Sequence, residues 1–156
     1  GAAGAVLLAQ DGTTQVLADG LDLPMGVAVG ADGTVYASES GAGRVVRIAG
    51  GRAEKVIDGL IEPQGIALTG DRLFVADVGA KELISCDLAN GARTVLATGL
   101  PVKAPPGVTP KLLGGVGDMS GPMVPFCGVA VDGQGTVFLS GDAEGSVIAV
   151  RPEGRA

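Results

Sequence analysis

The chain of 156 residues contains no histidine and no tryptophan, and its only aromatic residues are one tyrosine and three phenylalanines. Histidine is the usual general base of a catalytic triad and the commonest zinc ligand. Its absence excludes Ser-His-Asp and Cys-His catalytic arrangements and most zinc sites. Because aromatic residues are so few, any core has to be built from Val, Ile, Leu and Ala.

Positive charge and long apolar runs are also scarce. Eleven Lys and Arg residues stand against 17 Asp and Glu, which gives a net charge of −6. Nucleic-acid binders normally carry a basic face, so binding to a phosphate backbone is not expected. No apolar run approaches the ~20 residues of a membrane span, so we predict no spanning helix.

Glycine, in contrast, is abundant, with 28 residues, and it recurs at the turns of a repeated segment. Similar segments occupy residues 20–58, 59–98 and 126–153, with a period of about 39 residues. Each copy alternates short β-forming runs with turn signals such as Asp32-Gly33 and Asn90-Gly91. Four short strands joined by tight turns are typical of one blade of a β-propeller.

The pattern predicts thirteen strands. They are expected at residues 5–8, 15–18, 26–29, 34–38, 44–48, 53–57, 65–68, 73–77, 82–86, 93–97, 128–131, 136–140 and 146–150. Three of the four aromatic residues, Tyr36, Phe74 and Phe138, fall at one position of the second strand. A large residue recurring there is expected to pack between neighbouring sheets.

We therefore predict an all-β fold, a propeller segment of about three four-stranded antiparallel blades that forms half of a six-bladed ring. Residues 1–156 form one partial domain. It divides into the end of one blade (1–19), two blades (20–58 and 59–98), an insertion (99–125) and an incomplete blade (126–156). Three blades leave sheet faces open, so we expect further blades or a second chain to complete the ring.

The runs Pro24-Met-Gly-Val-Ala-Val, Asp32-Gly-Thr-Val-Tyr and Arg44-Val-Val-Arg-Ile resemble the NHL repeat and the related SMP-30/gluconolactonase-like six-bladed propellers. The resemblance covers nearly the whole chain outside residues 101–125. It implies a propeller fold and, for the gluconolactonase-like members, hydrolysis of a lactone with a divalent ion such as calcium in the axial channel. It implies Glu, Asn and Asp ligands, several of them directly before the glycine that opens an innermost strand.

This chain departs from that ligand pattern. The matching positions hold Met25, Gln64 and Cys127, of which only Gln64 offers an oxygen to a hard ion. The related streptogramin-lyase-like propellers are expected to use His, which is absent. No cofactor is therefore evident, and a calcium ion is expected from the resemblance alone.

Carboxylates recur after the second strand of each repeat, at Glu39, Asp77 and Asp142. Together with Gln64 they are candidate metal ligands, and carboxylates that converge can also act as acid and base. The alternative is that they cap turns by accepting backbone N–H groups. Glu39 and Asp77 share one position of the repeat while Asp142 comes one residue later, which favours capping.

Two more features are candidates for binding. Cys127 lies in an apolar setting without a neighbouring base, so a buried, inert thiol is expected rather than a nucleophile. The insertion at residues 101–125 is either a lid that contacts a ligand or partner, or a passive loop. The full set of ligand-binding candidates is Met25, Gln64, Lys103, Lys111, Met119, Met123, Phe126 and Cys127.

Three functions stay open at this point. The first is a propeller that binds a small molecule or a partner at the channel mouth. The second is a divalent-metal-dependent lactone or ester hydrolase with most of its ligands outside this chain. The third is a protein-interaction or sensor module without chemistry.

Overall fold

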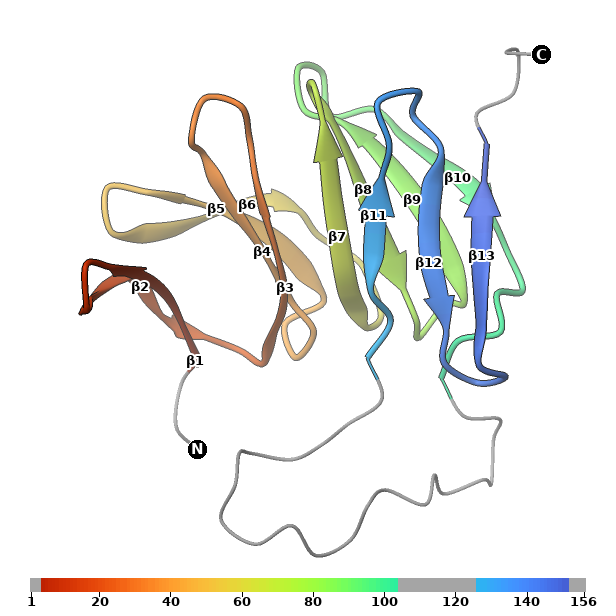
Figure 1. Ribbon diagram of the computed structural model, residues 1–156, viewed down its shortest axis with the longest axis horizontal. Coiled ribbons are helices and arrows are strands. Elements are labelled where there is room, and N and C mark those ends of the chain that lie inside the picture. Colours follow the sequence, from red (N-terminus) through yellow and green to blue (C-terminus); the bar gives the residue numbers. More distant parts are fainter. Residues whose placement is uncertain (1–3, 104–125, 152–156) are drawn as a thin grey trace, which may run out of the picture.

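The computed structural model describes residues 4–103 and 126–151, which form β-strands and no helix (Figure 1). The thirteen strands in these residues are β1 (Gly4–Gln10), β2 (Thr13–Leu21), β3 (Pro24–Val29), β4 (Val35–Glu39), β5 (Arg44–Ala49), β6 (Arg52–Ile57), β7 (Pro63–Thr69), β8 (Arg72–Asp77), β9 (Glu82–Asp87), β10 (Arg93–Ala97), β11 (Val129–Val131), β12 (Val137–Gly141) and β13 (Ser146–Val150). Each predicted strand overlaps one observed strand, and the all-β fold is confirmed. No helix of the described part is long and apolar enough to cross a membrane.

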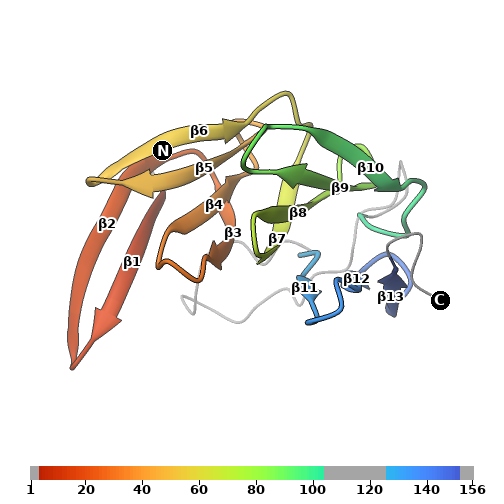
Figure 2. The same ribbon diagram turned by 90° about the horizontal axis from the view of Figure 1, so that it is seen from above.

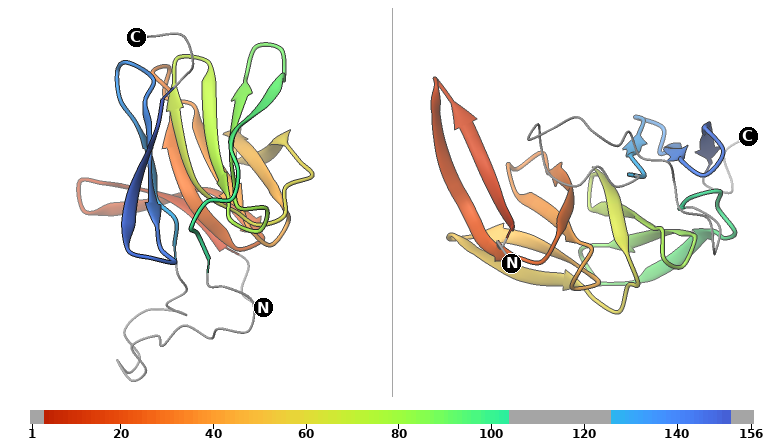
Figure 3. Two further views of the ribbon diagram at one scale, coloured as in Figure 1. Left: turned by 90° about the vertical axis from the view of Figure 1, so that its right-hand side faces the viewer. Right: turned by 90° about the horizontal axis from the view of Figure 1, so that it is seen from below.

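The strands form four antiparallel sheets in chain order. The N-terminal hairpin contains β1 and β2, sheet I contains β3 to β6, sheet II contains β7 to β10, and sheet III contains β11 to β13. Neighbours within each sheet are consecutive in the chain, as in a propeller blade, because tight turns join them. The sheets follow one another along an open arc, with the hairpin at one end and sheet III at the other (Figures 2 and 3).

A bulge in the same place identifies the hairpin as the outer half of a blade. In sheets I and II, the pairing of the third strand with the fourth is interrupted by a β-bulge. The bulge lies next to the pair Val45↔Ile57 in sheet I and next to the pair Leu83↔Ala97 in sheet II. Val6↔Ala18 of the hairpin also stands beside one. The strands β1 and β2 therefore correspond to the third and fourth strands of a blade.

The innermost strands β3, β7 and β11 lie side by side. Two glycines at the same position of the repeat, Gly26 and Gly65, permit this approach. A Cβ atom on Gly26 would collide with the carbonyl oxygen of Gln64, and a Cβ atom on Gly65 would collide with that of Cys127. Glycine is needed at these positions because the next strand's main chain fills the place of a side chain.

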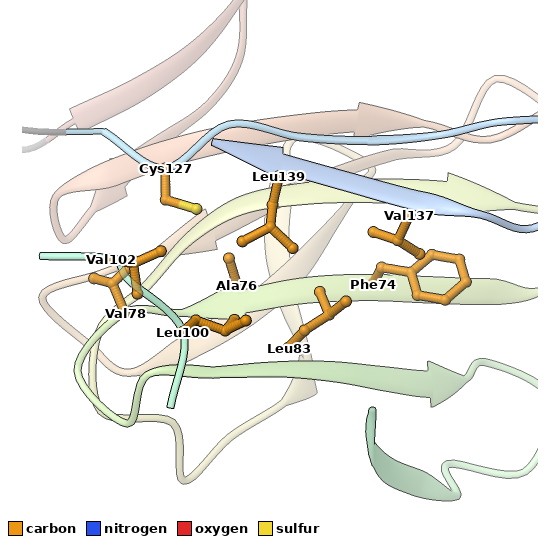
Figure 4. Close-up of a cluster of buried hydrophobic side chains, with 9 residues drawn as sticks. All are labelled: Phe74, Ala76, Val78, Leu83, Leu100, Val102, Cys127, Val137 and Leu139. Atoms are coloured by element: carbon orange, nitrogen blue, oxygen red, sulfur yellow. The ribbon is translucent and has the colours of Figure 1, made fainter. Parts of the chain in front are cut away.

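The core lies between successive sheets. Sheets II and III enclose Phe74, Leu83, Val137 and Leu139 with five further buried residues (Figure 4). Sheets I and II enclose a second cluster around Val45, Ile57 and Leu73, against which Tyr36 packs, and the hairpin and sheet I share a third. Tyr36 and Phe74 thus pack between sheets as predicted from their shared position in the repeat.

Candidate functional site

The predicted site residues gather where the connections between sheets lead into the innermost strands. We call this side the mouth face; the starts of β7 and β11, at the lower side of Figure 1, belong to it. The second strand of each sheet ends here in an acidic residue or just before one, because β4 and β8 pair antiparallel to β3 and β7.

Glu39 is completely buried at the end of β4. Its Oε2 accepts a hydrogen bond from Arg44 Nε at 2.5 Å, and its Oε1 accepts from Arg44 Nη2 at 3.1 Å and from the main-chain N of Asp22 at 2.8 Å. Hydrogen bonding to Glu39 raises the pKa of the Arg44 guanidinium, although burial opposes the shift. The carboxylate therefore ties the connection that precedes β3 to sheet I.

Asp77 has the same position in sheet II and binds main-chain groups only. Its Oδ2 accepts from Ile61 N at 2.8 Å, and its Oδ1 accepts from Glu62 N at 2.8 Å and from Ala80 N at 3.3 Å. Asp142 follows sheet III's β12, and its Oδ1 accepts from Lys103 N at 3.1 Å. All three acids thus accept N–H groups of the incoming connection, which is the capping arrangement.

Gln64 joins sheet II to sheet III. Its side-chain Oε1 accepts a hydrogen bond from Cys127 N at 2.8 Å, and its Nε2 lies 3.5 Å from Glu62 Oε1. The other carboxylate oxygen of Glu62 pairs with Lys103 Nζ. Lys81 Nζ donates to Val102 O at 2.8 Å.

The structure therefore brings four predicted residues, Gln64, Lys103, Cys127 and Asp142, to one junction. We call the group formed by Glu62, Gln64, Lys81 and Lys103 the junction network. Lys103 is the last described residue before residue 104. The charges of the network sit close together but reach solvent, because the side chain of Lys103 is 51% exposed and that of Glu62 is 31% exposed.

The other candidates are dispersed or lie outside the described residues. Met25 is half-buried on β3, and Phe126 is exposed just before β11. Lys111, Met119 and Met123 lie outside the described residues, as does most of the predicted lid.

Two serines were missed by the sequence analysis. Ser38 Oγ accepts from Gly26 N at 2.8 Å and donates to Gln64 O of the next sheet at 2.5 Å. Ser140 has the same position in sheet III and accepts from Gly128 N at 2.9 Å. The sequence contains a pattern that could have identified them, because each serine lies two residues after an aromatic residue of the repeat.

Both cysteines are free and buried, in different core clusters. Burial raises the pKa of the Cys127 thiol to about 11; the nearby Asp142 charge adds to the shift and hydrogen bonds with Ser140 oppose it. Burial also raises the pKa of Cys86. A thiol with so high a pKa carries little thiolate at neutral pH, which fits the expected inert role.

A metal centre is not assembled by the described residues. Within residues 4–103 and 126–151, no group of three or more His, Cys, Asp or Glu side chains lies close enough to hold an ion. In the same ranges every buried side-chain nitrogen and oxygen has a hydrogen-bond partner. The carboxylate oxygens of Glu39 and Asp77 already accept hydrogen bonds from main-chain N–H groups and, for Glu39, from Arg44. These oxygens are therefore not arranged to coordinate a metal ion.

Comparison with known proteins shows the fold. No known family pattern and no curated protein matches the sequence. Among solved structures, the chain resembles one in the nidogen/laminin complex, with a TM-score of 0.57 and 15% identity over 92% of this chain and 56% of that one. It also resembles streptogramin B lyase, with a TM-score of 0.51 and 15% identity over 85% of this chain and 41% of the lyase. A third is the PQQ-bound aldose sugar dehydrogenase of Streptomyces coelicolor, with a TM-score of 0.55 and 15% identity over 87% of this chain and 45% of the enzyme.

These similar proteins differ in function, so at this identity they establish architecture alone. The NHL and SMP-30 resemblance stays a prediction. The chain spans about half the length of the structures it resembles. By fold, the chain is a partial β-propeller.

Proposed function

We propose that the chain is a binding module of the β-propeller class, which takes a small polar molecule at the junction network on its mouth face. The observation that carries the proposal is the exposed Glu62–Lys103 pair, supported from below by buried Gln64 and flanked by Lys81. Propeller ligands commonly approach the end of the ring at which side chains of several blades converge, and this junction joins two blades.

The chemistry of the network favours a ligand with hydroxyl and carboxylate or lactone oxygens. Lys81 and Lys103 supply ammonium donors, Glu62 supplies an acceptor, and the Gln64 amide nitrogen lies 3.5 Å from Glu62 Oε1. Sugar acids and sugar lactones present both kinds of group within a few ångströms. The resemblance to gluconolactonase-like propellers supports the same class.

Calorimetric titration of the protein with D-gluconate and D-glucono-lactone tests the proposal. We expect binding that weakens at least tenfold in Lys103→Ala and is unchanged in Lys55→Ala. Lys55, on strand β6 of sheet I, is a matched control because it is similarly exposed and forms its own ion pair with Asp58. Absence of binding by either probe, or equal losses in both variants, would refute a ligand site at the junction network.

Metal-dependent hydrolysis is the second candidate, and the resemblance alone supports it. The same lactone, followed by acid release with and without calcium, separates the two functions. Calcium-dependent turnover that survives removal of contaminating esterase would favour the hydrolase. Binding without turnover favours the binding module.

A further inference from the structure

We propose that sheet III is an assembly surface, and that it binds strand β3 of a second copy of this chain. The surface consists of the residues of sheet III that point away from sheet II. They are Gly128 just before β11, Ala130 on β11, Phe138 and Ser140 on β12, and Val147 and Ala149 on β13. We call this set the uncovered face of sheet III.

Within residues 4–103 and 126–151, exposure at equivalent positions shows that no other sheet covers this face. Three residues of the third strands are equivalent, because each pairs with the residue two positions after the repeated aromatic of the second strand. The pairs are Val45 with Ser38, Leu83 with Ala76, and Val147 with Ser140. Val45 and Leu83 are 0% exposed because the next sheet covers them, whereas Val147 is 77% exposed. Phe74 is 3% exposed and Phe138, at the same position of sheet III, is 38% exposed. Side chains of the type that the other sheets bury are thus presented to solvent.

The space beside the repeated glycines differs between the sheets in the same way. At Gly26 and Gly65 the carbonyl of the next sheet, from Gln64 and Cys127, occupies the space of a missing side chain. At Gly128 the described residues leave that space open, since the nearest of their atoms to a Cβ atom would be the Phe126 ring at 3.8 Å and Ser140 Oγ at 3.9 Å. Ser38 donates its hydroxyl to the Gln64 carbonyl of the next sheet at 2.5 Å, while the Ser140 hydroxyl lies 3.5 Å from the carbonyl oxygen of Phe126, in its own repeat.

The other end of the molecule presents the matching half. Val27 and Val29 on β3 are 54% and 59% exposed. Their counterparts on β7, Ile66 and Leu68, pack against the preceding sheet. In each internal junction the contacting carbonyl belongs to the residue before the repeated glycine. By the same rule, Met25 of a second copy would place its carbonyl over Gly128 and accept the Ser140 hydroxyl, while Val27 and Val29 would cover Phe138 and Val147.

Such a contact is head-to-tail, since the two copies use different surfaces. Repetition of the contact closes a ring if the rotation allows it and otherwise extends a chain of copies. The strands β1 and β13 both match the third strand of a blade, so β1 of the incoming copy has to leave its place beside sheet I. This displacement exposes Val6, which is otherwise buried, and therefore weakens the association. Because two copies are needed, the associated fraction rises with protein concentration.

Analytical ultracentrifugation over a wide concentration range, with three single variants, tests the proposal. We expect the native chain to associate. In Gly128→Ala the added methyl group is accommodated by the single chain but collides with the incoming carbonyl, so association is lost. Gly133→Ala, on the β11–β12 turn of the same sheet with open space around it, should associate like the native chain. Val27→Asp should also prevent association, because it alters the opposite surface.

Mixing the two defective variants gives a further check. Gly128→Ala keeps an intact β3 and Val27→Asp keeps an intact uncovered face, so the mixture should form dimers that neither forms alone. A native chain that is monomeric at every concentration would overturn the proposal. So would association that survives Gly128→Ala, or a mixture that stays monomeric. Circular dichroism and melting curves of each variant establish that lost association is not lost folding.

Discussion

At the scale of single residues, Glu39 and Asp77 of the mouth face are structural. The carboxylate of Asp77 accepts three main-chain N–H groups, and that of Glu39 accepts one together with the Arg44 guanidinium. An ionised carboxylate used in this way forms charge-assisted hydrogen bonds, each of which is stronger than a neutral one. These residues fix how each connection enters its sheet.

Removing the charge of Glu39 should therefore be costly. We expect Glu39→Gln to lower the free energy of unfolding by about 1–3 kcal/mol, because a buried acceptor and its ion pair are weakened. Urea unfolding measures the effect. Glu54→Gln is the matched control; it breaks the exposed Arg47–Glu54 pair and should cost at most about 1 kcal/mol. Equal losses in the two variants would contradict the structural role of Glu39.

Cys127 leads to a prediction about pH. Only the thiolate reacts with iodoacetamide, and a pKa of about 11 leaves roughly a thousandth of the thiol ionised at pH 8. Alkylation in the folded chain should be slow and should accelerate about tenfold per pH unit up to that pKa. Mass spectrometry of the peptide around Cys127 follows the reaction, with the urea-unfolded chain as a fast-reacting control. Rapid alkylation of the folded chain at neutral pH would indicate an activated nucleophile instead.

At the scale of strands and sheets, the order of elements was predictable because it depends on local chemistry. Turn residues such as Asp132-Gly133 and alternating β-formers act within a few residues, and all predicted strands overlap observed ones. Asp132 illustrates this locality; the Thr136 N–H holds the pKa of its carboxyl below the ordinary value. The junction network was not predictable, because Glu62 pairs with Lys103 across 41 residues of sequence.

The repeated glycines give a prediction at this scale. Gly65→Ala should destabilise the chain by about 1–3 kcal/mol, because its methyl group would collide with the Cys127 carbonyl and push sheets II and III apart. Gly128→Ala, at the same position of sheet III, should leave the melting temperature of the single chain unchanged. Melting curves at low protein concentration compare the two. Similar melting temperatures for both variants would contradict the close approach of β7 and β11.

At the scale of the whole molecule, the described part behaves as a row of sheets rather than as a domain around one centre. Three clusters lie between successive sheets, and each sheet contacts its neighbours in the row. The fold class followed from the repeat, and so did the expectation of incomplete coverage. The sequence could not show which side chains would be left exposed, because exposure depends on whether another sheet covers them. Val45 and Val147 occupy the same position of the repeat, yet Val45 is buried and Val147 is exposed.

This arrangement also predicts how the molecule responds to calcium. Since the oxygens of Glu39 and Asp77 already accept hydrogen bonds, millimolar calcium should leave the melting temperature unchanged. Magnesium at equal ionic strength is the control for screening. A calcium-specific rise that disappears in Asp142→Asn would contradict this expectation and favour the metal-dependent hydrolase.

The junction between sheets I and II and that between sheets II and III have one more consequence, which concerns how the repeat can diversify. At both junctions the glycine contacts the peptide carbonyl of the residue before the next sheet's glycine, and a peptide carbonyl is the same whatever side chain its residue carries. Contact through the main chain therefore does not by itself dictate which side chain this position carries. Met25, Gln64 and Cys127, three chemically unrelated residues, occupy it here. Such a scaffold can acquire new chemistry at its mouth without redesigning the contacts that hold its blades together.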